Sequence, residues 1–189
     1  MLDRRQFVAR LLADRGHLLV VSGLGSPTYD VAACSDHPLN FYLWGAMGGA
    51  AMIGLGLALA QPDHKVAVIT GDGEMLMGLG SLATVGVKQP KNLSIVVLDN
   101  AHYGETGMQP SHTKAGVDLV AIAKACRFVN AGVVTDIEHA AEARDLLHSG
   151  NGPTFIQAVV KIDDLPRVLP VRDGHQIKQR FMQALGTQT

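Results

Sequence analysis

Two apolar runs of strand length, each ending at acidic or amide residues, constrain the fold of this chain more than any other feature. Residues 65–70 (KVAVIT) lead into Gly-Asp-Gly at 71–73, and residues 93–98 (LSIVVL) lead into Asp-Asn at 99–100. Between them, residues 74–89 have helical length and a mostly apolar face, which predicts a strand–helix–strand unit with parallel strands. Because such crossovers are right-handed, both strands end at the same edge of the sheet.

The side chains at these two strand ends predict a metal site. Asp72 and Asn100 are far apart in the sequence, but the parallel unit brings them to one edge. Magnesium prefers oxygen ligands, uses one or two protein carboxylates and takes its other ligands from phosphate and water. One Asp, one Asn and a backbone carbonyl fit this description, and Gly71 and Gly73 let the backbone approach a diphosphate. We therefore expect Mg2+ to carry much of the binding of a diphosphate here.

The rest of the chain alternates between strand and helix patterns. This alternation predicts an α/β fold, a three-layer sandwich with a mostly parallel sheet and helices on both faces. We expect one domain over residues 1–189, without internal repeats. Strands are predicted at residues 17–22, 65–70, 93–98, 128–134 and 154–160, and helices at residues 1–15, 28–33, 43–60, 74–89, 117–126, 135–149 and, as a C-terminal tail helix, about 173–186.

The composition narrows the function classes. The net charge is −1 and the pI is about 6.7, so the chain has no electrostatic footprint for nucleic acid. With 47% hydrophobic and 17% charged residues, the chain is apolar for a globular protein, which indicates that a second chain covers part of its surface. Cys34 and Cys126 form no CxxC pair, and the N-terminal residues lack the apolar core of a signal peptide. We therefore expect a cytoplasmic protein.

One uncharged segment has to be weighed as a membrane span. Residues 43–60 (LWGAMGGAAMIGLGLALA) reach the length at which a spanning helix becomes a candidate. Each of the five glycines in this segment costs about 1 kcal/mol of helix propensity relative to alanine, and a strand pattern follows at once. We therefore expect a buried helix and no membrane association. The spacing of Gly45 and Gly49 allows another backbone or a cofactor to approach closely.

A glycine turn follows the first predicted strand. Residues 23–27 (GLGSP) close this strand, and the backbone N–H groups of such a turn can hold a phosphate. A plain turn explains the same residues equally well. A non-catalytic nucleotide-binding module is a further alternative, although the segment lacks the third glycine of a dinucleotide fingerprint.

The two strand-end motifs carry a family resemblance. The GDG at residues 71–73, followed at this interval by the DN at 99–100, resembles the fingerprint of thiamine diphosphate-dependent enzymes, a GDG followed by paired asparagines. The resemblance extends from residue 17 to about residue 160 and implies the thiamine diphosphate-binding fold. Within this superfamily, the chain is most similar to the β subunits of sulfopyruvate decarboxylases and to the matching half of phosphonopyruvate decarboxylases, through residues 41–60, 71–86, 90–93 and 98–110.

This resemblance assigns roles to individual residues. It implies that Asp72 and Asn100 bind Mg2+ through their side chains and His102 through its backbone carbonyl. Met47 is expected to prop thiamine diphosphate in a bent conformation, and the Gly45 carbonyl to accept a hydrogen bond from its aminopyrimidine ring. The implied cofactor-binding residues are Gly23, Gly25, Ser26, Gly45, Met47, Gly71, Asp72, Gly73, Glu74, Asn100, His102, Tyr103 and Gly104.

Two residues depart from the family pattern. Asp99 stands where the first asparagine is common, which is tolerable because the second asparagine is the ligand. Glu74 occupies a position that is usually small, close to the expected diphosphate. A carboxylate at this position is expected to repel the diphosphate unless the side chain turns away.

The resemblance also implies a partner chain. Enzymes of this superfamily activate thiamine diphosphate with a glutamate on a separate pyrimidine-binding domain, and the glutamates at 74, 105, 138 and 142 have no such context. We expect a pyrimidine-binding (α) subunit to supply this acid in a hetero-oligomer. Candidate catalytic residues in the present chain are His112, Tyr103 and Gln109, in or beside the loop at residues 104–114, where loop structure alone is the competing explanation.

The expected function is that of the diphosphate- and magnesium-binding subunit of a thiamine diphosphate-dependent carboxy-lyase. Its substrate is expected to be a short 2-oxo acid, with sulfopyruvate first and phosphonopyruvate next. The alternatives within the superfamily are a subunit of an acetolactate synthase-like carboligase and one half of an oxidoreductase. The absence of cysteine clusters argues against an iron–sulfur oxidoreductase.

Overall fold

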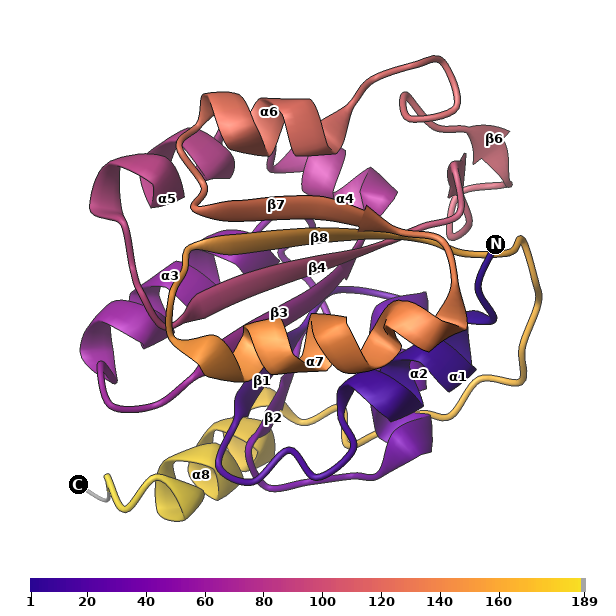
Figure 1. The fold of residues 1–189 in the computed structure, drawn as a ribbon. Coiled ribbons are helices and arrows are strands. Elements are labelled where there is room, and N and C mark those ends of the chain that lie inside the picture. Colours follow the sequence, from indigo (N-terminus) through magenta and orange to yellow (C-terminus); the bar gives the residue numbers. More distant parts are fainter. Residues whose placement is uncertain (188–189) are drawn as a thin grey trace.

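The computed structural model describes residues 1–187 and contains a six-stranded parallel sheet with the strand order β2-β1-β3-β4-β8-β7. The last two residues of the predicted domain, 188 and 189, lie outside the described range. In Figure 1 the strands run through the middle of the molecule, with helices above and below them. The strands are β1 (Leu19–Ser22), β2 (Asn40–Tyr42), β3 (Val66–Gly71), β4 (Leu93–Asp99), β7 (Asn130–Val134) and β8 (Thr154–Val159).

Helices cover both faces of this sheet, as predicted. One face is covered by α3 (Ala50–Ala60), α5 (Ser81–Lys88) and α6 (Leu119–Ala125), and the other by α1 (Arg4–Leu11), α2 (Ser26–Cys34) and α7 (Ala140–Ser149). In Figure 1, α6 lies above the sheet and α7 below it. The tail helix α8 (Gly174–Ala184) packs at the edge strand β2, and Asp173 caps it. The predicted three-layer α/β fold class is confirmed.

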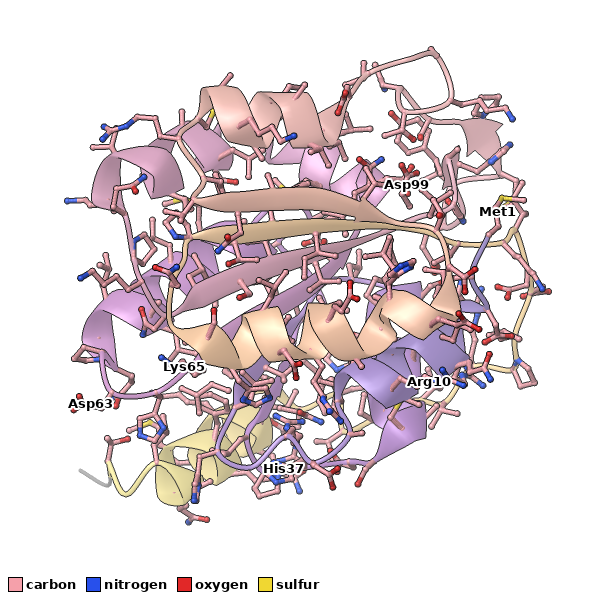
Figure 2. The ribbon with its side chains drawn as sticks, viewed as in Figure 1. Met1, Arg10, His37, Asp63, Lys65 and Asp99 are labelled. Atoms are coloured by element: carbon pink, nitrogen blue, oxygen red, sulfur yellow. The ribbon has the colours of Figure 1, made fainter. Side chains whose placement is uncertain are left out.

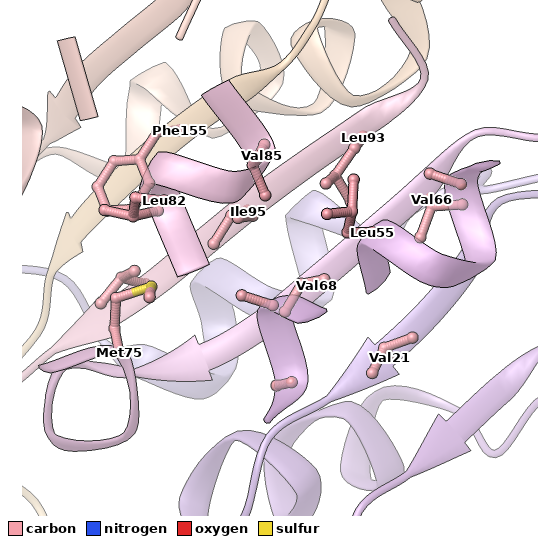
Figure 3. Close-up of a cluster of buried hydrophobic side chains, with 14 of the residues drawn as sticks. Val21, Leu55, Val66, Val68, Met75, Leu82, Val85, Leu93, Ile95 and Phe155 are labelled. Atoms are coloured by element: carbon pink, nitrogen blue, oxygen red, sulfur yellow. The ribbon is translucent and has the colours of Figure 1, made fainter. Parts of the chain in front are cut away.

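The central strands are continuous apolar runs because both faces of the sheet are buried. Every residue of β4 is buried, and successive side chains point to opposite faces. Ile95 and Val97 join the core under α3, α5 and α6, whereas Val96 and Leu98 join the core under α1, α2 and α7. Figure 3 shows part of the first core around Leu55 of α3.

The prediction of one continuous helix over residues 74–89 is wrong. The segment forms two helices, α4 (Asp72–Met77) and α5, with a turn between them. At this turn the backbones of Gly48 and Gly78 touch, and a Cβ atom at Gly78 would lie 2.2 Å from the Gly48 carbonyl oxygen. The break therefore lets the loop before α3 lie against the end of α4.

The predicted helix at residues 43–60 forms only in its second part. It begins at Ala50, and the preceding residues form a loop in which Ala46 (φ 55°) and Gly48 (φ 87°) have left-handed backbone conformations. The buried side of α3 includes Ala51, Gly54 and Leu55, so burial of this helix was predicted correctly. Within residues 1–187, no helix combines the length and the apolar character needed to cross a membrane.

The start of the helix predicted at residues 135–149 is also wrong. Thr135 does not begin it, because Asp136 accepts a hydrogen bond from the Glu138 N–H and caps a short 3-10 helix, Ile137–His139. The α-helix α7 begins after this turn.

Candidate active site

A cavity of about 500 Å3 lies at the carboxyl edge of the sheet. Beyond the end of β4, two short strands, β5 (His102–Tyr103) and β6 (Gln109–Pro110), form an antiparallel hairpin that contributes to its wall. The edge is on the right in Figure 1, and Figure 2 labels Asp99 there. Open α/β sheets commonly bind ligands at this edge.

Asp72 is buried at the end of β3, where hydroxyl groups hold its carboxylate. Ser111 Oγ donates to Asp72 Oδ2 over 2.5 Å, and Thr113 Oγ1 lies 3.4 Å from the same oxygen. Thr113 Oγ1 is closer to Asp99 Oδ1, at 2.9 Å, and to Ser111 Oγ, at 2.8 Å, so one hydroxyl network joins the two aspartates. Burial raises the pKa of Asp72 to about 6; the hydrogen bond from Ser111 opposes this increase and the nearby Asp99 adds to it.

Asp99 serves the loop after β4 and does not line the cavity. Its Oδ2 accepts from Gln157 Nε2 at 2.6 Å, and its Oδ1 accepts from the Ala101 N–H at 2.8 Å. Ala101 has φ 61°, which turns the chain sharply, and Asn100 Oδ1 accepts from the His102 N–H at 2.9 Å. The turn leaves Asn100 and His102 at the cavity.

The loop before α3 brings Met47 to the cavity. Its side chain lines the cavity, whereas Gly45 does not line it. Trp44 holds this loop, because its Nε1 donates to the Val171 carbonyl at 2.8 Å and the Arg172 guanidinium lies 5.1 Å from its ring centroid. The segment that precedes α8 therefore fixes the position of the loop.

Tyr103 lies directly against Gly73 and contacts His112. A Cβ atom at Gly73 would lie 2.8 Å from Tyr103 Cδ1, so glycine leaves the room that the ring needs. The Tyr103 hydroxyl is hydrogen-bonded to His112 Nδ1, and the two rings meet edge to face with centroids 6.0 Å apart. Both side chains line the cavity. Gln109, the third catalytic candidate, is exposed and does not line it.

The carboxylate of Glu74 turns toward the glycine turn after β1. Its Oε2 accepts from the Leu24 N–H and from Thr70 Oγ1, each at 2.9 Å. The side chain is buried, and a Cβ atom at Gly23 would lie 1.9 Å from Oε2. The Glu74 carboxylate, which the sequence places beside the expected diphosphate, thus accepts hydrogen bonds from a backbone N–H and a hydroxyl group.

Most of the predicted site residues meet at the cavity. Gly23, Gly25, Gly45 and Gln109 do not line it, although Gly23 and Gly25 pack on glutamate side chains that do. Within residues 1–187, no group of three or more His, Cys, Asp or Glu side chains could hold a metal ion. The predicted residues that line the cavity are Ser26, Met47, Gly71, Asp72, Gly73, Glu74, Asn100, His102, Tyr103, Gly104 and His112.

The sequence reasoning missed the residues that support these groups. Ser111, Thr113 and Gln157 bind the two aspartates, and nothing in their local sequence marks them. Thr70 is different, because it is the last residue before the GDG motif and its position at a strand end is readable from the sequence. Its hydroxyl faces Glu74.

The parallel sheet, the cavity at its carboxyl edge and the GDG and DN strand ends define the cofactor-binding domain of a thiamine pyrophosphate enzyme. The chain matches the family described as "Thiamine pyrophosphate enzyme, C-terminal TPP binding domain" over residues 23–158, and it belongs to this family. The family prediction is confirmed, and the match supports thiamine diphosphate as the cofactor.

Within this family, the chain is similar to decarboxylases of two kinds. The chain is 37% identical over 173 residues to sulfopyruvate decarboxylase subunit beta of Methanocaldococcus jannaschii, covering 88% of each protein. It is 38% identical over 178 residues to phosphonopyruvate decarboxylase of Streptomyces viridochromogenes, covering 91% of this chain and 43% of that protein. The predicted similarity to both kinds of decarboxylase is confirmed.

A solved structure shares the fold. It is a putative thiamin diphosphate-dependent enzyme from Mycobacterium smegmatis, which superimposes with a TM-score of 0.70 at 18% sequence identity. The match covers 84% of this chain and 32% of that one, so the chain spans about a third of the larger protein.

Proposed function

We propose that this chain is the diphosphate- and magnesium-binding subunit of a thiamine diphosphate-dependent 2-oxo acid decarboxylase. The observation that carries the proposal is the similarity to subunit beta of a sulfopyruvate decarboxylase over 88% of both proteins. Sulfopyruvate is the first candidate substrate and phosphonopyruvate the second. Both are short 2-oxo acids with a second anionic group. A cytoplasmic location stays a prediction.

The oxygen atoms at the carboxyl edge fit a magnesium ion that is bound to a diphosphate. The Asp72 carboxylate, the Asn100 amide oxygen and the His102 backbone carbonyl are hard donors of the kind that Mg2+ prefers. Only one of the three is charged, so the diphosphate and water complete the coordination. The hydrogen bond from Ser111 holds the Asp72 carboxylate in place for this role.

The turn after β1 is the second part of the diphosphate site. It leads into α2, where Gly25 is the N-cap residue and no side chain caps the helix. The start of such a helix can bind an anion through its free N–H groups, although Pro27 contributes none. Leu24 and Ser26 line the cavity together with the GDG motif.

Thiamine diphosphate, when bound, supplies the nucleophilic carbon and the electron sink for the loss of CO2. The side chains of this chain position it and the substrate. Met47 supports the cofactor at the cavity wall. The Tyr103 hydroxyl is hydrogen-bonded to His112 Nδ1 beside the cavity, and we assign this pair to binding of the anionic substrate and to proton transfer.

A complementary pyrimidine-binding subunit supplies the activating glutamate in this proposal. The carboxylate of Glu74 accepts a hydrogen bond from the turn after β1, and Glu105 is exposed.

Near the cavity, the side chains of Met47, Met77 and Met108 are 37%, 68% and 43% exposed. Flexible apolar side chains of this kind adapt well to a partner surface. A hetero-oligomer with its active site at the interface accounts for both observations.

The proposal is tested by co-expressing the chain with its α subunit and measuring CO2 release from a panel of 2-oxo acids. We expect release from sulfopyruvate or phosphonopyruvate that requires both thiamine diphosphate and Mg2+. Asp72→Asn is expected to abolish it, whereas the matched control Asp145→Asn on the exposed side of α7 leaves it unchanged. If the chain is active alone, the assignment of the activating glutamate to a partner subunit is contradicted. Formation of acetolactate from pyruvate favours the alternative of a carboligase subunit. Release of CO2 without thiamine diphosphate overturns the proposal.

A further inference from the structure

The carboxylate of Glu74 cross-links the two segments that frame the diphosphate side of the cavity. Glu74 belongs to α4, two positions after Asp72, and it contacts Leu24, which is 50 positions away in the sequence. Its Oε2 accepts from the Leu24 N–H and from Thr70 Oγ1, both at 2.9 Å. One oxygen atom thus joins the metal motif, the end of β3 and the glycine turn after β1.

This contact is built around the glycine at position 23. A Cβ atom there would lie 1.9 Å from Glu74 Oε2 and 2.7 Å from Thr70 Oγ1. The Gly23 backbone is also held on both sides, because its N–H donates to the Ile69 carbonyl and its carbonyl accepts from Thr28 Oγ1, each at 2.7 Å. The carboxylate of Glu74 therefore fills the volume that a side chain at position 23 would need.

The second carboxylate oxygen of Glu74 points to a bound group. Oε1 is buried and has no hydrogen-bond partner in the described part of the chain. The side chain is 4% exposed and lines the cavity. Buried carboxylate oxygens normally have a donor, so a ligand or a water molecule in the cavity has to supply one. A diphosphate cannot donate unless it carries a proton, but water bound to its metal ion can.

We propose that Glu74 is a positioning residue for cofactor binding, which holds the turn at residues 23–26 beside the cavity. This inference rests on the proposed function, because it takes the cavity to be the site of the metal–diphosphate group. From the sequence, Glu74 is expected to repel the diphosphate unless its side chain turns away, and its carboxylate binds the Leu24 N–H and Thr70 Oγ1. Repulsion and positioning predict opposite effects of removing the side chain, and a purely structural role predicts no effect on affinity.

The test is calorimetric titration of thiamine diphosphate, with Mg2+ present, into the complex of this chain with its α subunit. We expect Glu74→Ala to weaken binding about tenfold, the effect of losing about 1.4 kcal/mol, and Glu74→Gln to stay within about threefold of the unsubstituted protein because its amide oxygen still accepts from Leu24. Glu142→Gln, an exposed change of the same kind on α7, is the matched control and is expected to leave the affinity unchanged.

Each other outcome counts against the proposal in a different way. Tighter binding by the Ala and Gln variants at position 74 means that the carboxylate repels the diphosphate. A lower melting temperature with unchanged affinity means that it is only structural. If the unsubstituted complex shows no Mg2+-dependent binding of thiamine diphosphate, the proposed function itself fails and the inference fails with it.

A second experiment tests the contact between Gly23 and Glu74 directly. Gly23→Ala is expected to displace the carboxylate and to weaken cofactor binding, whereas Gly132→Ala, with open space around it on β7, is the matched control. In the double variant Gly23→Ala/Glu74→Ala the clash with the carboxylate is gone, so the two losses are less than additive. Additive losses contradict a direct coupling. If the Gly23→Ala protein does not fold, the titrations of Glu74→Ala and Glu74→Gln test the proposal without it.

Discussion

The hydroxyl of Ser111 donates a 2.5 Å hydrogen bond to Oδ2 of Asp72, although the two residues are 39 positions apart in the sequence. Ser111 follows the β5–β6 hairpin directly, and its own N–H donates to the Ala101 carbonyl at 2.9 Å. The loop that carries Tyr103 and His112 therefore also fixes the carboxylate that we assign to magnesium.

Ser111→Ala tests this relationship. Losing a hydrogen bond to a charged group costs about 1.5–3 kcal/mol, so we expect Mg2+-dependent binding of thiamine diphosphate to weaken at least about tenfold. Calorimetry on the complex with the α subunit measures this change. Ser149→Ala, at the exposed end of α7, is the control. An affinity equal to that of the unsubstituted protein contradicts a role of Ser111 in holding Asp72.

The hydrogen bond between Tyr103 and His112 leads to a prediction about turnover. Tyr103→Phe and His112→Asn are each expected to lower kcat by about a hundredfold, as for a lost proton-transfer group, with little change in cofactor affinity. If the two act as a unit, the double variant is about as slow as the slower single variant. Steady-state CO2 release measures this, with His148→Asn on α7 as the control. If the fold-losses in kcat of the two single variants multiply in the double variant, Tyr103 and His112 act independently.

Two glycines of α3 are predicted to respond in opposite directions to alanine. A Cβ atom at Gly54 would lie 2.2 Å from Val68 Cγ2, so Gly54→Ala overpacks the core and is expected to cost about 1–3 kcal/mol. Gly56 is exposed with no atom nearby, so Gly56→Ala is expected to stabilise by about 0.5–1 kcal/mol. Urea unfolding measures both values. Shifts of the same sign contradict the close packing of Gly54 on Val68.

The pKa of Asp36 predicts how stability depends on pH. Burial alone would raise this pKa, but hydrogen bonds from Arg180 and Tyr42, together with the Arg180 charge, outweigh burial and lower it. Stability from a depressed carboxyl pKa is fully present above the unfolded value, about 3.9, and is lost as the pH falls through the folded value. Below about pH 4, the folded chain therefore loses this contribution.

Arg180→Met is expected to flatten this part of the pH profile. At pH 7 the substitution is expected to cost less than about 1 kcal/mol, because the Asp36 side chain is 49% exposed and water screens the pair. Denaturation between pH 3 and pH 7 measures the profile, and Lys178→Met, exposed on α8, controls for the lost charge. A profile parallel to that of the unsubstituted protein contradicts the assignment to Asp36.

Much of the carboxyl edge was predictable from the sequence. The strands β3 and β4 are buried on both faces, so they appear as unbroken apolar runs, and Asp72 and Asn100 follow directly from where these runs end. The helix after Asp72 was predicted less well. Its break depends on the approach of Gly78 to Gly48, and helical periodicity carries no information about such a contact.

By itself, the sequence determined the family, the edge at which the predicted ligands gather and five of the six strands of the main sheet, because burial patterns and strand-end motifs are local. It did not predict the short edge strand β2 or the break between α4 and α5. The tertiary structure decided which side chains meet there. Ser111 reaches Asp72, and Glu74 fills the space beside Gly23, across 39 and 51 positions of chain. Contacts of this length depend on the packing of the whole sheet and its loops. This packing brings the Glu74 carboxylate to the Leu24 N–H, where we propose that it supports the cofactor site.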